Sequence, residues 1–240
     1  VLKKAGMIVL GSLFAAASAF PQITVISPAG RDALKACAGY AEDVLHDRWD
    51  MNERTDLGWR IFNTVELPLS YLANISFQNG LFSAQTVYTP GGPSDYSDAN
   101  ITILDSAYLY SAMLGKNGKN FPIDASKYTR LALRMYLSPG SAGLTGQLFW
   151  SKNTIYNGMS VANGFYVHDN WFIYIVDIPA LGLEVGADPW SGLVDSLRFD
   201  PMFKKDKTIQ IDWIRLVEND GAAARTISWS GSSGSVDIYL

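Results

Sequence analysis

The side chains best suited to binding chemistry lie in one short segment, residues 128–137, where they occupy even-numbered positions. They are Tyr128, Arg130, Arg134 and Tyr136. Alternate side chains of an extended strand point to the same face, so these four would line one surface. Guanidinium and phenol groups can hydrogen-bond to sugar hydroxyls, and aromatic rings can stack on the apolar side of a sugar ring. The spacing therefore predicts a surface that binds carbohydrate.

Three residues of later segments would extend this surface if their strands lie beside the first one. They are Gln147 and Phe149, within residues 145–151, and Arg198, within residues 195–199. A second interpretation stays open, in which the surface is ordinary solvated sheet. Its arginines would then pair with carboxylates across neighbouring strands, with Asp200 as one partner.

Sequence patterns of catalysis are absent. Glycoside hydrolysis needs two carboxylates about 5 to 10 Å apart across one sugar, and the sequence has no compact array of acidic residues that would supply them. It has no G-x-S-x-G, G-x-G-x-x-G or P-loop motif either. With His46, His168 and a single cysteine, Cys37, a zinc site is not expected. We expect a protein without catalytic activity, and a polysaccharide lyase that uses tyrosine or histidine with arginine stays the enzymatic alternative.

The elements that must position these groups are β-strands. Within residues 130–137 every odd position is apolar, and such a period of two is typical of a strand with one buried face. Clusters of Gly, Pro, Asn and Asp separate further segments of this kind. These segments are residues 145–151, 171–178, 195–199 and 208–217. The sequence therefore predicts an all-β fold, a jelly-roll β-sandwich of two antiparallel sheets.

The beginning of the sequence has the layout of a secretory signal peptide. Lys3 and Lys4 precede an apolar run that ends in the small residues Ala17, Ser18 and Ala19. We expect a signal-peptide helix over residues 1–19, cleavage after Ala19, and a secreted or cell-surface location. An uncleaved membrane anchor is the alternative.

Composition shifts divide the rest of the chain. We expect residues 20–39 to be a lead-in segment and residues 40–218 to form the sandwich. We expect residues 219–240 to form a linker followed by a β-hairpin. This hairpin would either start a further β module or be donated to another copy of the chain, which would make it a route to self-association.

The overall composition describes a globular protein with a sizeable core, because 48% of its 240 residues are hydrophobic and 18% are charged. The formal net charge is −4 and no basic patch is present, which argues against nucleic acid as a partner.

Three segments in a fixed order resemble a known family. Residues 40–56 contain Y-A-E-D-V-L, D-R-W-D-M and T-D, and residues 128–136 read Y-T-R-L-A-L-R-M-Y. Residues 190–216 contain W-S-G-L-V-D-S-L-R-F-D-P and I-D-W-I-R-L. Together they resemble the galactose-binding-like jelly rolls that serve as carbohydrate-binding modules in secreted bacterial proteins. The resemblance spans residues 40–218 and implies non-catalytic binding of a polysaccharide or other glycan.

The same resemblance implies a structural calcium between the first and last strands. Asp47, Asp50, Glu53 and Asp56 lie close together in the sequence, and calcium takes several carboxylate and carbonyl oxygens as ligands. We expect Asp47 and Asp50 to bind the ion, with Asp212 of the last strand completing the site. In the alternative, Asp47 and Asp56 cap turns and Asp50 pairs with an arginine.

Carbohydrate binding is thus the function that the sequence predicts. A structural subunit of an extracellular filament or surface layer is the alternative from another class, because the predicted C-terminal hairpin could pair with a neighbouring copy.

Overall fold

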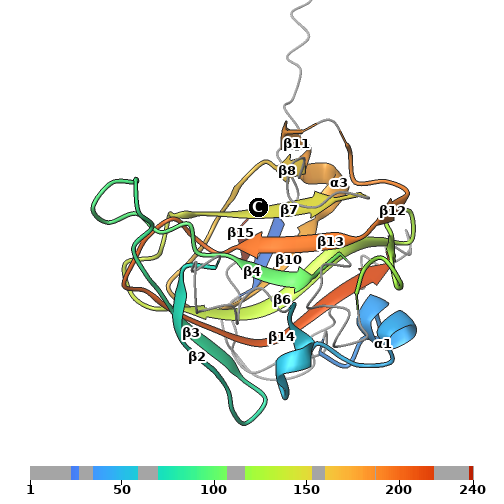
Figure 1. Ribbon diagram of the computed structural model, residues 1–240, viewed down its shortest axis with the longest axis horizontal. Helices are drawn as coiled ribbons and strands as arrows, with labels where there is room; N and C mark the ends of the chain where they lie inside the picture. The colour runs from blue at the N-terminus through green and yellow to red at the C-terminus, as the bar shows by residue number, and fades with distance from the viewer. Residues whose placement is uncertain are drawn as a thin grey trace, which may run out of the picture.

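The computed structural model describes residues 23–26, 35–58, 70–106, 117–152, 160–186, 188–218 and 238–239, with the backbone alone in the first and last ranges. Strands dominate (Figure 1). They are β1 (Ile23–Ile26), β2 (Leu72–Phe77), β3 (Phe82–Thr86), β4 (Ile101–Leu104), β5 (Ile123–Asp124), β6 (Tyr128–Leu137), β7 (Thr145–Ser151), β8 (Ser160–Ala162), β9 (Phe165–Tyr166), β10 (Asn170–Asp177), β11 (Leu183–Val185), β12 (Leu193–Val194), β13 (Ser196–Asp200), β14 (Thr208–Glu218) and β15 (Ile238–Tyr239). The helical elements are α1 (Tyr40–Leu45), the 3-10 turn η1 (Arg54–Asp56) and α3 (Ile178–Leu181).

Two antiparallel sheets form the body of the protein. The seven-stranded sheet has the order β15-β1-β10-β6-β14-β3-β2, and the six-stranded sheet has the order β11-β8-β7-β13-β4, with β9 paired to β7. A small pair, β12 and β5, lies outside both. The sheets enclose one hydrophobic core, which confirms the predicted all-β sandwich.

The core forms because the strands alternate as their sequences predict. On β6, Leu131, Leu133 and Met135 are fully buried and point toward the six-stranded sheet. Leu197 and Phe199 of β13 meet them from the other side in the same cluster. Burying a side chain of this size stabilises the fold by about 1.5 to 3 kcal/mol, so these alternating residues fix which face of each strand turns outward.

Most predicted strands agree with the observed ones, and a short helix that was not predicted is present. The segment predicted over residues 145–151 coincides with β7, and the ends of β10, β13 and β14 differ from their predictions by one residue. Residues 40–218 were predicted to form an all-β sandwich, yet α1 begins at Tyr40. It has only six residues, too few for a helical period to show in the sequence. It buries Tyr40 and Leu45 beside β14 (Figure 1).

Two strands outside the predicted sandwich range of 40–218 join the seven-stranded sheet. β1 pairs with β10, and β15 pairs with β1 of the same chain. Of the predicted C-terminal hairpin, only residues 238–239 are described, so donation to another copy stays a prediction. The predicted signal peptide, residues 1–19, lies outside the described residues. Among the described helices none has the length and apolar character that a membrane crossing needs.

The six-stranded sheet ends in an irregular edge strand. All three residues of β11 are exposed, and its pairing with β8 shifts register between Leu183 and Val185. Glycines with positive φ stand at both ends of this strand, Gly182 at 70° and Gly186 at 103°. At the opposite edge, the backbone N–H of Gly58 donates to the carbonyl of Thr102 on β4 (2.8 Å).

Candidate functional site

The structure divides the predicted ligand surface between two sheets. Arg130, Arg134 and Tyr136 belong to β6 of the seven-stranded sheet, whereas Gln147 and Arg198 belong to β7 and β13 of the six-stranded sheet. The two sheets face each other across the core, so their outer surfaces point in opposite directions. The expectation that all these side chains share one surface is therefore wrong, because β7 and β13 do not pair with β6.

Tyr128 lies on neither outer surface. It is buried in the core, where its ring meets that of Tyr40 edge-on and its hydroxyl donates to Asp43 (3.0 Å). The pairing of β6 with β14 shifts register between Val217 and Glu218, beside Tyr128. An extra residue in one strand turns the following side chain to the other face, which simple alternation cannot anticipate.

Arg130 matches the alternative interpretation of the surface. Its Nε lies 3.8 Å from the Asp177 carboxylate on β10, and the two residues are direct cross-strand partners. This is the ordinary cross-strand ion pair of a solvated sheet. The partner predicted for this surface, Asp200, lies instead on β13 with Arg198.

Further along β6 and β10, away from Arg130, lies a group that we call the Trp171 surface: Arg134, Tyr136, Trp171, Asp212 and Lys35. The Arg134 guanidinium lies 4.4 Å from the centre of the Trp171 ring and donates to one oxygen of Asp212 (2.5 Å). Lys35 donates to the other oxygen (2.8 Å). The rings of Tyr136 and Trp171 are 5.7 Å apart.

The outer side of the six-stranded sheet carries a second group, the Arg198 surface: Arg198, Phe149, Asp200, Asp98, Gln147, Tyr96 and Glu184. At its centre the Arg198 guanidinium lies 4.6 Å from the centre of the Phe149 ring. Its Nε and Nη2 donate to the two oxygens of Asp200 at 2.7 and 2.6 Å, the two-pronged geometry that arginine and carboxylate favour. Asp98 lies 3.5 Å from the same guanidinium.

These strands present the group outward because their other side chains enter the core. Leu148 and Trp150 on β7 are buried in the core. Side chains alternate along a strand, so Gln147 and Phe149 point away from the core. Gln147 donates to Glu184 of β11 (2.6 Å). Tyr96 and Asp98 come from the loop between β3 and β4. The Tyr96 ring stacks on Phe203, with ring planes 6° apart.

Burial shapes the electrostatics of the Arg198 surface. Asp200 is fully buried, and burial raises its pKa to about 7 even though the Arg198 pair acts to lower it. Burial likewise raises the pKa of Asp98. The pKa of Tyr96 is raised by burial and then by the charges of Asp98 and Asp200. The geometry is thus an arginine stacked on a ring and paired with two carboxylates, both with a pKa raised by burial.

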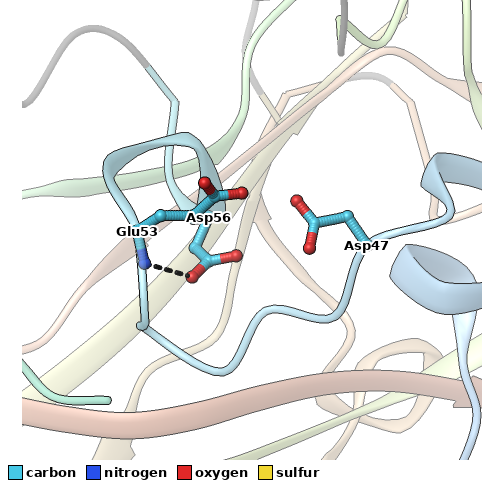
Figure 2. A group of neighbouring side chains, drawn as sticks. All are labelled: Asp47, Glu53 and Asp56. Atoms are coloured by element: carbon cyan, nitrogen blue, oxygen red, sulfur yellow. Dashed lines mark hydrogen bonds between the residues drawn. The ribbon is translucent and has the colours of Figure 1, made fainter. Parts of the chain in front are cut away.

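Three of the acidic residues at the predicted calcium site do gather. Carboxylate oxygens of Asp47, Glu53 and Asp56 all lie within 4.8 Å of one another. Figure 2 shows that Asp47, which follows α1, points toward the carboxylate of Asp56 at the end of η1. The backbone N–H of Glu53 donates to Asp56 (3.2 Å).

The donor set at this place fits a hard cation. Asp56 is fully buried, and its Oδ1 has no hydrogen-bond partner in the described part of the chain, and the same holds for Oδ1 of Asp50. Burial raises the pKa of Asp56 to about 7, and repulsion by Asp47, Asp50 and Glu53 adds to the rise. A buried carboxylate that is crowded by other carboxylates would gain most from a bound calcium ion.

The structure does not bring Asp212 into this acidic group. Both of its oxygens accept hydrogen bonds from cations, one from Arg134 and one from Lys35. The prediction of Asp212 as a metal ligand is therefore wrong. It followed from the position of β14, but a shift of register at Asp212 places this side chain over β6, beside Arg134.

Sequence reasoning missed Trp171 and Asp98 as members of the two surfaces, whereas Phe149 was expected to join Gln147 and Arg198. Trp171 is the direct cross-strand partner of Tyr136, and Phe149 that of Arg198. Each lies in a segment that was predicted as a strand, so the missing information was which strands pair and in what register.

Comparisons with known proteins add little. No family model and no curated protein matches the sequence. Among solved structures the chain is similar to a point mutant of a carbohydrate binding module family 29, with a TM-score of 0.33 and 10% sequence identity over 60% of this chain and 74% of that one. A likeness this slight carries no argument about the ligand, so the side chains alone bear on function.

Proposed function

We propose that this chain is a non-catalytic carbohydrate-binding domain of the galactose-binding-like kind, and that its ligand binds the Arg198 surface. The observation that supports this most is the arrangement of Phe149 under Arg198, with Arg198 fixed by the buried Asp200. A ring offers the apolar side of a sugar a flat partner, while the guanidinium and Gln147 offer donors to its hydroxyls. Because these groups already hold one another in place, little conformational entropy is lost on binding.

The charges favour a neutral sugar. In the part of the chain that the structure describes, the surface has one guanidinium, that of Arg198, against the carboxylates of Asp98, Asp200 and Glu184. A uronate or sulfate group would meet more negative than positive charge here. Sugar hydroxyls suit the site better, because each can donate to a carboxylate and accept from the guanidinium or amide.

The same geometry supports binding without catalysis. Asp98 and Asp200 are the two carboxylates nearest the centre of the surface, and both pair with Arg198. Asp200 has no exposed surface, so it cannot contact a glycosidic oxygen or activate a water beside a bound sugar. A glycosidase needs two carboxyl groups free to reach the bond from opposite sides.

Phe149→Ala tests the site. Losing the ring should cost about 1.5 to 3 kcal/mol of the apolar contact with a sugar, which is roughly a tenfold to hundredfold loss of affinity. The wild type is screened on an array of neutral and charged glycans, and the affinity for the best neutral ligand is then measured by calorimetry.

Tyr166→Ala is the matched control, since this aromatic side chain is 71% exposed on β9 of the same sheet but outside the surface. It should bind like the wild type. Equal binding by the Phe149→Ala protein, or an array on which the wild type retains no neutral glycan, would contradict the proposal.

We also propose that Asp47, Glu53 and Asp56 hold a calcium ion that stabilises the loop after α1. At a calcium concentration one hundred times the Kd, binding adds about 2.7 kcal/mol to the free energy of unfolding. Removing calcium with a chelator should therefore lower the Tm of the wild type, and Asp56→Asn should abolish this difference.

The matched control is Asp212→Asn, which changes an aspartate outside the acidic group. Its Tm should still respond to the chelator. Identical melting of the wild type with calcium and with chelator would leave turn capping as the role of these residues.

A further inference from the structure

The Trp171 surface on the opposite sheet has no part in the proposed function. Tyr136 on β6 and Trp171 on β10 are direct cross-strand partners, and their rings lie at 50° to each other. Both rings are half-buried and neither belongs to a hydrophobic core cluster. Together they present aromatic surface to solvent in the middle of the sheet rather than at its edge.

Buried apolar side chains of the same sheet flank Arg134. Ala132, Ile173 and Trp213, from three adjacent strands of the same sheet, form a small buried cluster of their own. Arg134 lies between two members of this cluster, since Ile173 and Trp213 are its direct cross-strand partners on the two sides. Because its neighbours on both sides are buried, the Arg134 side chain loses little rotamer freedom when a ligand binds.

Among the described residues at this place, positive charge exceeds negative charge. Arg134 and Lys35 both donate to Asp212, one to each oxygen, so two cations surround one carboxylate. Lys35 comes from the segment before α1, far from β6 in the sequence. A cross-strand aromatic pair alone would account for Tyr136 and Trp171. It does not account for Lys35, which lies at Asp212 although Arg134 already balances the charge of that aspartate.

We propose that the Trp171 surface is a second carbohydrate-binding site and that it takes a sugar residue carrying a carboxylate, such as a uronic acid. The sugar ring stacks on Trp171 and Tyr136, and its carboxylate accepts hydrogen bonds from Arg134 and Lys35. The Arg198 surface has the opposite excess of charge and takes a neutral sugar. Because the two surfaces point away from each other, the domain binds an acidic and a neutral polysaccharide at the same time and links them.

The test is electrophoresis of the full chain through native gels that contain polygalacturonate, a neutral galactomannan or no polysaccharide. The acidic polymer should retard the wild type, and added salt should weaken the retardation because the contacts are ionic. Trp171→Ala and Lys35→Gln should each weaken binding of polygalacturonate at least tenfold. Lys35 lies outside the sheets, so its variant tests the charge without disturbing strand packing.

Two variants serve as controls. Arg130→Gln removes an arginine from the same strand and the same face, but from the pair with Asp177, and it should keep the wild-type retardation. Phe149→Ala changes only the opposite sheet and should also keep it. Near-ultraviolet and far-ultraviolet circular dichroism of each variant verifies its fold.

Three results would overturn the inference. Polygalacturonate fails to retard the wild type, or the Trp171→Ala and Lys35→Gln proteins are retarded as strongly as the wild type, or Phe149→Ala abolishes retardation. Failure of the neutral site is a separate result, since it removes retardation by neutral polymers and leaves that by polygalacturonate intact.

Discussion

The buried pair of Arg198 and Asp200 offers a sharp test of how the Arg198 surface is held together. In Arg198→Met the aspartate keeps its place on β13 but loses both of its donors, at 2.7 and 2.6 Å. Asp200 has no exposed surface, so water cannot replace them. Removing one partner of such a pair costs about 3 to 5 kcal/mol. For a domain of this size, that corresponds to a drop in Tm of about 6 to 20 °C.

The cost should depend on pH. Burial raises the pKa of Asp200 to about 7 in the folded wild type, well above its ordinary value, and Arg198 opposes the rise. Without Arg198 the pKa of Asp200 rises further. At pH 5 the folded variant therefore holds Asp200 in its protonated form. At pH 8 folding requires Asp200 either to take up a proton or to be buried as an unpaired charge. A raised pKa contributes stability that is lost as pH increases. The variant should therefore be much less stable than the wild type at pH 8 and closer to it at pH 5.

The assay is urea unfolding at both pH values for the wild type, Arg198→Met, Asp200→Asn and the double variant. Asp200→Asn should cost less than Arg198→Met, because Arg198 still has Asp98 at 3.5 Å. The double variant should recover most of the stability at pH 8, since neither buried charge remains. If Arg198→Met is as stable as the double variant at pH 8, or loses equal stability at both pH values, the reasoning is refuted.

Three further variants test local features of the fold. Asp169 accepts hydrogen bonds from three backbone N–H groups of the loop between β6 and β7. Burial acts to raise the pKa of Asp169, but these bonds lower it overall. Asp169→Ala should therefore lower the free energy of unfolding by about 2 kcal/mol at pH 7, and in urea titrations this difference should fade as the pH falls below 4. Gly118→Ala would place a methyl group 1.8 Å from the carbonyl oxygen of Asp195, so we expect no folded, soluble protein on gel filtration. His46 ends α1 with φ at 56°, and His46→Gly should raise the free energy of unfolding by about 1 kcal/mol in urea.

Local patterns were enough to predict the strands and the fold class. The alternation over residues 130–137 identified β6 and its buried face, because that information lies in neighbouring residues. The same pattern misplaced Tyr128, since a register shift against β14 turns it into the core. Pairing depends on the partner strand, and no periodicity within one strand records it.

The candidate site was harder to predict for the same reason. Gln147 and Arg198 were identified as polar residues that point away from the core, but their strands belong to the other sheet. The acidic group was predicted only in part: Asp47 belongs to it, but Asp50, the other expected ligand from this segment, does not. Glu53 and Asp56 join Asp47 because the chain turns back on itself through η1. Asp212 was misassigned because its neighbours Arg134 and Lys35 reach it only after folding.

The irregular edge of the six-stranded sheet bears on the solubility of the protein. An open sheet edge can recruit a strand from another molecule and start aggregation, and proteins resist this with short, kinked or charged edge strands. β11 has three residues, a shift of register, flanking glycines in positive φ and the carboxylate of Glu184 at its middle. At the other edge β4 is partly occupied by Gly58. Among the described residues neither edge offers a long, flat row of free backbone groups, so neither edge is suited to pairing with a strand of another molecule.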